Sequence, residues 1–134
     1  MRKIFFTIAL SVVALNALAN HCTVRGIHPK NTNDYYGDVS CHNAVKPAIN
    51  VVGRLTIDQS QINGLTTSTG AIFTANTIFN AITITNLASP GVILVRHDTL
   101  VKGPITFVHQ AGTVCIDGSS MLLSNVINGH VAHC

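Results

Sequence analysis

Two aspartates are the residues best placed for acid–base chemistry. Asp98 follows His97, and Asp117 lies further along the chain, each just after a short aliphatic run. If the two runs are neighbouring strands, the carboxylates approach one another. Such a pair can cleave a glycan by protonating the leaving oxygen and activating a water. His97, Asp98 and Asp117 therefore form the strongest candidate site in the sequence.

The same residues also have a structural interpretation. Asp117-Gly118 is an ordinary turn sequence, and His97-Asp98-Thr99 resembles a corner between strands. A groove for several sugars needs more surface than so short a chain provides. The Gly-x-Ser-x-Gly elbow, the phosphate-binding loop and the dinucleotide fingerprint are all absent from the sequence. We therefore predict no enzyme, no catalytic residue and no cofactor, and keep the aspartate pair as an alternative site.

Seven histidines in 134 residues raise the question of a metal site. His130, His133 and Cys134 have spacings found in zinc proteins. That ligand set needs Cys134 as a thiolate, which conflicts with a disulfide in an oxidising compartment. His21 with a free amino group at residue 20 would chelate copper only weakly. The sequence therefore predicts no metal site.

The four cysteines predict two disulfides, because their number is even and none forms a CxxC pair. Three connectivities are possible. We favour Cys22 with Cys41 and Cys115 with Cys134, because each pair encloses a separate end of the chain and the two pairs have the same separation. A Cys41–Cys134 bridge would instead tie together the two ends of an elongated molecule.

Residues 1–19 have the pattern of an export signal. Arg2 and Lys3 precede an apolar run over 4–15, and Ala17 and Ala19 supply the small residues of a cleavage site. The alternative is a membrane anchor, which needs about 20 apolar residues. We predict cleavage after Ala19 and a secreted, extracellular or periplasmic protein whose mature part has no membrane span.

The charge of the remaining chain excludes one class of partner. Without the signal, six Lys and Arg residues face five aspartates and no glutamate. The basic residues are scattered along the chain, so the electrostatic footprint of a nucleic-acid binder is missing. The remaining length of about 115 residues suits one domain with its own core.

A recurring short phrase predicts the fold. It consists of Gly or Asn, any residue, an aliphatic residue, Thr or Ala, and one further side chain, and it occurs at 53–57, 80–84, 103–107 and 129–133. This period of roughly 25 residues indicates a solenoid, in which each coil buries its apolar side against the next. Strand alternation places one set of side chains inward and the middle threonines outward. The inward set is Leu55, Ile57, Ile82, Ile84, Ile105 and Phe107, and the outward set is Thr56, Thr83 and Thr106.

We therefore predict an all-β protein, a short parallel β-helix of about three to four coils over residues 50–134. The right-handed form is favoured because the hexapeptide rhythm of left-handed coils is absent. Residues 20–49 show no strand period and contain two cysteines, so we expect an irregular, disulfide-pinned cap over the first coil. A β-sandwich is the competing architecture, but it gives no physical reason for phrases that align position by position.

These features favour a non-catalytic protein with a structural, binding or self-assembly role at the cell envelope or outside the cell. The last phrase places His133 where the others have an apolar residue, so we expect an uncovered strand edge and self-association through this end. The opposing expectation is that the Cys115–Cys134 bridge folds the tail over the stack as a cap. Besides a second copy, the ligands expected for the surface are a glycan or another protein.

The alternative function is a small carbohydrate-active or metal-binding secreted protein. It would use Asp98, Asp117 and nearby histidines.

Overall fold

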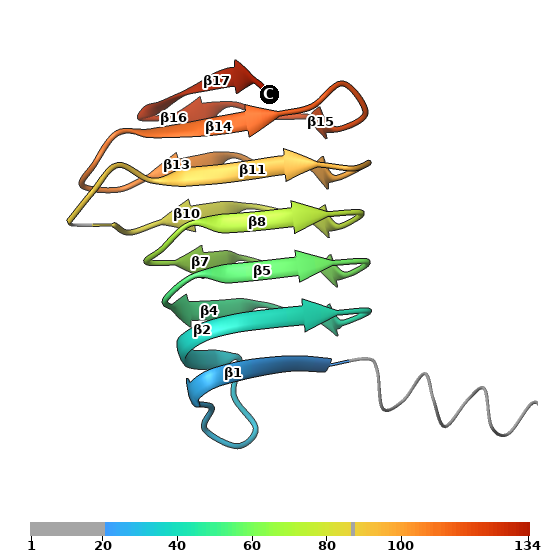
Figure 1. Cartoon of the computed structure of the whole chain (residues 1–134), viewed down its shortest axis with the longest axis vertical. Helices are drawn as coiled ribbons and strands as arrows, with labels where there is room; N and C mark the ends of the chain where they lie inside the picture. Colours follow the sequence, from blue (N-terminus) through green and yellow to red (C-terminus); the bar gives the residue numbers. More distant parts are fainter. Residues whose placement is uncertain (1–20, 87) are drawn as a thin grey trace, which may run out of the picture.

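The protein is a β-solenoid. The computed structural model describes residues 21–86 and 88–134, and within these ranges it contains seventeen strands and no helix. The strands stack along one axis in parallel, with β1 added in antiparallel orientation at the N-terminal end (Figure 1). The predicted solenoid is confirmed and the sandwich alternative is wrong. The predicted export signal, residues 1–19, lies outside the described residues.

Three strips of strands run along the stack, and we name them faces A, B and C. Each coil passes from face A to face B and then to face C. Face A contains β2 (Asp34–His42), β5 (Leu55–Asp58), β8 (Ile72–Ala75), β11 (Val92–Arg96), β14 (Gly112–Ile116) and β17 (Gly129–His133). Face B contains β3 (Val45–Lys46), β6 (Gln61–Ile62), β9 (Ile78–Phe79), β12 (Leu100–Val101) and β15 (Met121–Leu122). Face C contains β4 (Ile49–Val52), β7 (Thr66–Ser68), β10 (Ile82–Ile84), β13 (Ile105–Phe107) and β16 (Val126–Ile127).

The winding is right-handed. Followed from β2 in Figure 1, the chain crosses the near face from left to right, returns behind it and climbs one level with each circuit. Nearly all parallel strand–crossover–strand connections adopt this hand, because a right-twisted strand packs back onto its neighbour most readily in this way.

The number of coils differs from the prediction. Face A has six strands, one for each turn, instead of the three to four coils expected from the sequence. Residues stacked on this face are 16 to 21 positions apart along the chain, from Val39 to Leu55 and onward to Val131. The predicted period was therefore too long.

The four recurring phrases are not equivalent positions, and this explains the error. The phrases at 80–84 and 103–107 do stack, as β10 on β13 of face C. Those at 53–57 and 129–133 belong to β5 and β17 of face A. Strands of all faces need the same alternation of inward and outward side chains, so their sequences resemble one another whichever face they occupy.

Alternating side chains build the core as predicted. The six side chains expected to point inward are each at most 2% exposed: Leu55, Ile57, Ile82, Ile84, Ile105 and Phe107. Thr83 and Thr106 form a stacked outward pair on face C, preceded by Thr67. Thr56 also points outward, but on face A, so it does not belong to that row.

A column of glycines marks the corner where the chain enters face A. The strand register places six glycines at the same position in successive coils, each two residues before an inward aliphatic side chain: Gly37, Gly53, Gly70, Gly91, Gly112 and Gly129. The last three leave room for the ring of Phe107. A β-carbon on Gly91 or Gly129 would lie 2.6 Å from this ring, and one on Gly112 would collide with its Cδ1 and Cε1.

Gly112→Ala should therefore destabilise the protein by about 1–3 kcal/mol, because the added methyl group overpacks a closed core. Gly118→Ala is the matched control, since a β-carbon there meets nothing within 4 Å. Urea unfolding of both variants measures the difference. Equal midpoints would show that the glycine column is not a packing requirement.

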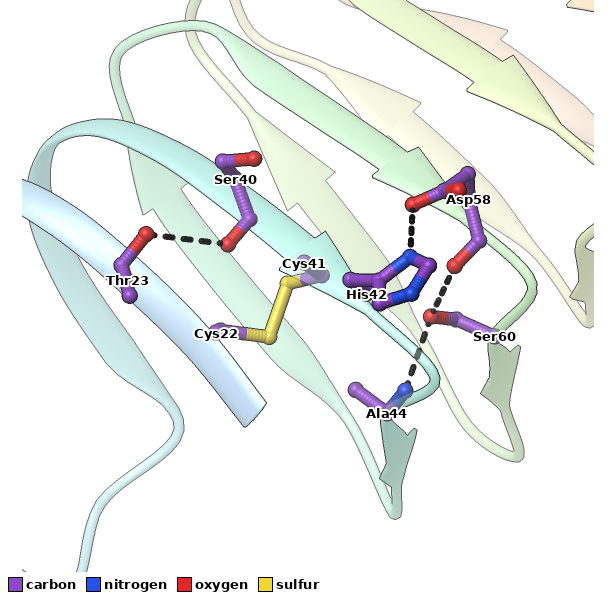
Figure 2. Close-up of a disulfide and its surroundings, with 8 residues drawn as sticks. All are labelled: Cys22, Thr23, Ser40, Cys41, His42, Ala44, Asp58 and Ser60. Atoms are coloured by element: carbon purple, nitrogen blue, oxygen red, sulfur yellow. Dashed lines mark hydrogen bonds and ion pairs between the residues drawn. A yellow bond between two sulfur atoms is a disulfide. The ribbon is translucent and has the colours of Figure 1, made fainter. Parts of the chain in front are cut away.

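The N-terminal segment is more regular than the predicted cap over 20–49. β1 (His21–Ile27) pairs antiparallel with β2, and the Cys22–Cys41 disulfide joins the two strands (Figure 2). Parallel pairing already begins at Asp34, so the first coil takes up most of the segment expected to be irregular. Strand β2 could not be recognised in the sequence because one of its inward positions is Gly37, which supplies no apolar side chain.

Candidate functional site

The candidate aspartates lie at the corner where the chain leaves face A for face B. At this corner one residue in each of four coils has a left-handed backbone, with φ between 46° and 52°: Asn43, Gln59, Asn76 and His97. A small buried residue follows directly in three of these coils and two positions later, as Thr99, in the fourth. Ser60, Thr77 and Thr99 are buried hydroxyl residues of this column, and each is at most 6% exposed.

The buried hydroxyls join neighbouring coils. Ser60 Oγ donates to the carbonyl of Asp58 at 2.8 Å and accepts from the amide N–H of Ala44 in the preceding coil at 3.0 Å. Ser120 Oγ accepts in the same way from the N–H of Thr99 at 3.1 Å. The column satisfies buried backbone donors at a corner where no strand partner is available. Sequence reasoning missed it, although Ser60 and Thr77 directly follow their corner residues in the sequence.

The backbone of His97 and Asp98 is bound by the turn at Asp117 and Ser119 in the next coil, and we call this contact the bracket. The N–H of His97 donates to Asp117 Oδ2 at 2.8 Å, and the N–H of Asp98 donates to Ser119 Oγ at 3.0 Å. Ser119 in turn donates to Asp117 Oδ1 from its amide and its hydroxyl. The carboxylate of Asp117 is thus occupied in holding a turn whose two central residues have left-handed backbones, with φ of 52° and 61°.

This bracket lowers the pKa of Asp117 from 3.8 to about 2. The main cause is the hydrogen bond from the N–H of His97, and the hydroxyls of Ser120 and Ser119 add to it. A general acid in glycan cleavage needs a raised pKa, so that it carries a proton near neutral pH. The carboxyl of Asp117 is shifted in the opposite direction and suits a structural corner.

The bracket should make folding stability fall in strong acid. Because the pKa of Asp117 is lower in the folded chain than its ordinary 3.8, the unfolded chain binds more protons between these values. The stabilisation is complete above about pH 4 and is lost as the pH falls towards 2. Asp117→Asn should flatten this part of the pH profile of the urea midpoint, and an unchanged slope would contradict the assignment.

The metal site considered at the C-terminus does not form from its proposed ligands. Cys134 is joined to Cys115 in a disulfide and is not available as a thiolate. His130 Nε2 lies 3.4 Å from Thr113 Oγ1. Among residues 21–86 and 88–134, no group of three or more His, Cys, Asp or Glu side chains converges as a metal ion would require.

Both disulfides have the predicted pairing, Cys22 with Cys41 and Cys115 with Cys134. The first holds β1 on β2, and the second joins the residue after β17 to β14. Two disulfides are compatible with an extracellular or periplasmic location, where thiols are oxidised.

The C-terminal end of the stack exposes apolar side chains. On face A the inward column is 0% exposed at Ile93 and Val114, but its last member, Val131, is 45% exposed. Three further apolar side chains near this end are about half exposed: Met121 at 57%, Leu123 at 58% and Ile127 at 49%. In the described part of the chain, β15, β16 and β17 are the last strands of their faces, so one edge of each has no neighbouring strand.

The Cys115–Cys134 bridge does not make the tail a cap, contrary to one of the two expectations. β17 pairs with β14 over five residues, from Gly129 to His133. The N–H of Cys134 then donates to the carbonyl of Ile116, so the tail extends face A to its end. Val131, the last inward side chain of face A, is covered by no further strand of the described chain and remains 45% exposed.

No helix among the described residues is long and apolar enough to cross a membrane. Comparison of the chain with protein-family models, with curated proteins and with solved structures gave no match. The fold defines the class, a right-handed parallel β-solenoid with a disulfide at each end.

Proposed function

We propose that this protein is an exported, non-catalytic β-solenoid that assembles by pairing the C-terminal ends of two copies. The observation that carries the proposal is the contrast within one column, where Val131 is 45% exposed and Val114 beneath it is 0% exposed. Unpaired strand edges beside exposed apolar side chains are a template for further strands. A second copy supplies the same edges and the same apolar groups.

The opposite end of the stack is covered, which favours a two-fold dimer over a head-to-tail chain. β1 lies along the N-terminal edge of β2. The loop after β1 places the ring of His28 flat on Tyr35, with centroids 4.1 Å apart, and Lys46 Nζ lies 5.8 Å from the Tyr35 centroid. A head-to-tail contact would bury the charge of Lys46 against the apolar side chains of the C-terminal end. A two-fold contact instead joins the same end of two copies, so the assembly is complete as a dimer.

Export supports the same role. The pattern over residues 1–19 is that of a cleaved signal, and the two disulfides suit an oxidising compartment. We place the protein in the periplasm or outside the cell. There a compact, doubly cross-linked stack would act as a structural or binding element of the cell envelope.

A carbohydrate-active function at Asp98 and Asp117 has weaker support. The turn around His97 keeps Asp117 ionised, so Asp117 does not suit the role of general acid and Asp98 would have to supply the proton. Asp117→Asn offers a direct check, since loss of glycan cleavage in this variant would favour the enzyme instead.

Val131→Lys should convert the dimer into a monomer, because it places an unpaired charge in the centre of the contact. We expect the dissociation constant to rise about tenfold or more. Val45→Lys is the matched control, since Val45 is 69% exposed and lies in β3, at the opposite end of face B from β15. Light scattering over a range of concentrations distinguishes the outcomes. A wild-type protein that stays monomeric throughout, or equal weakening by both variants, would refute the proposal.

A further inference from the structure

His21 and His42 face each other across the N-terminal hairpin. They are direct partners in the antiparallel pairing of β1 with β2, and both are exposed. Their neighbours Cys22 and Cys41 pack against the core and form a disulfide, so the two histidines lie on the outer side of face A. Side chains directly opposite in such a pair have Cβ atoms about 4.5–5.5 Å apart, which lets two imidazoles share one ion.

Asp58 orients the ring of His42. This residue is the partner of His42 on the other side, in β5, and its Oδ1 lies 2.8 Å from His42 Nδ1 (Figure 2). The hydrogen bond places the ring proton on Nδ1, so the lone pair available to a metal is on Nε2. Figure 2 shows this second nitrogen directed away from Asp58. A carboxylate behind an imidazole in this way fixes its tautomer and the orientation of its ring, as in many metal sites.

From this geometry we propose that His21 and His42 bind a divalent transition-metal ion that prefers imidazole ligands. Copper, zinc and nickel ions share this preference, and Cu²⁺ binds most tightly of the three. The remaining coordination positions are left to water. The ion is therefore exchangeable and surface-bound.

The site was not visible in the spacing of the sequence. His21 and His42 are 21 positions apart, and only the hairpin register, locked by the adjacent Cys22–Cys41 disulfide, brings them together. The hairpin is at the end of the stack opposite β17, so metal binding here is independent of the proposed dimer contact (Figure 1).

Titration of the purified protein with Cu²⁺ alone tests the proposal. Calorimetry at about pH 7.5, where free imidazole is mostly neutral, should give one ion per chain at this site. Electron paramagnetic resonance should show coordination by imidazole nitrogen. His21→Gln and His42→Gln should each lower the affinity at least about tenfold, and Asp58→Ala about 10- to 100-fold, because it frees the orientation of the ring.

His97→Asn is the matched control. It removes another exposed histidine, and Asn tolerates the left-handed backbone of that position, where φ is 52°. This variant should bind Cu²⁺ as the wild type does. His21→Gln leaves the contact between His42 and Asp58 intact, so it reports on the site even if changes at His42 disturb the hairpin. Unchanged affinity in His21→Gln, or an equal loss in His97→Asn, would overturn the proposal.

Discussion

Ile84→Ala should destabilise the protein by about 2–5 kcal/mol, whereas Thr83→Ala should change its stability very little. Ile84 is 1% exposed and stacks between Ser68 and Phe107 in the inward column of face C. Truncation leaves a cavity in the middle of the stack. The coils on either side are held by ladders of backbone hydrogen bonds, so they cannot collapse to fill it.

Thr83 is the control because it lies in the same strand and points outward. Its methyl and hydroxyl groups are partly solvated, so their removal opens no internal cavity. Urea unfolding of the two variants gives the comparison. A similar loss at both positions would contradict the inward and outward alternation on which the solenoid depends.

Replacing Cys115 and Cys134 together by Ser should cost about 3 kcal/mol, the value expected for releasing a loop of roughly 20 residues in the unfolded chain. The folded state should also loosen locally, because in the described part of the chain β14 is the only strand that pairs with β17. Thermal unfolding and amide hydrogen exchange at 129–133 measure the two effects. Faster exchange there is expected even at temperatures where the core remains folded.

Changing Cys22 and Cys41 to Ser removes the other disulfide, and this variant shows whether the loosening of β17 is specific to the C-terminal bridge. Cys41 is 1% exposed in the first coil, so this variant should lose stability without faster exchange in β17. If both variants loosened β17 equally, the C-terminal bridge would have no specific role in holding the strand.

The class of fold was predictable from the sequence because alternation of buried and exposed side chains is a local property. The period was not, because corner lengths vary. The connection from β10 to β11 runs from Thr85 to Gly91, while that from β16 to β17 is a single residue, Asn128. Gly followed by any residue and then an aliphatic residue occurs in all six coils at face A, although it also occurs once on face C, at 103–105. It recurs because glycine is needed at the corner, most clearly beside Phe107.

The candidate site was predictable only in part. Asp98 and Asp117 follow strands of successive coils, so a contact between the two corners could be expected. Their role could not, because it depends on the left-handed turn that points the N–H of His97 at a carboxylate. The pairing of His21 with His42 could not be predicted from the sequence, since it requires an antiparallel hairpin within an otherwise parallel stack.

Amide hydrogen exchange at low and high protein concentration tests the central claim most directly, because it reports where two copies meet. If the C-terminal ends pair, exchange should slow with concentration in β15, β16 and β17, whose outer edges have no neighbouring strand within the described chain. The amides of β1 at the opposite end should exchange at the same rate throughout. Identical rates at both concentrations across the last coil, or slowing confined to β1, would contradict assembly through this end.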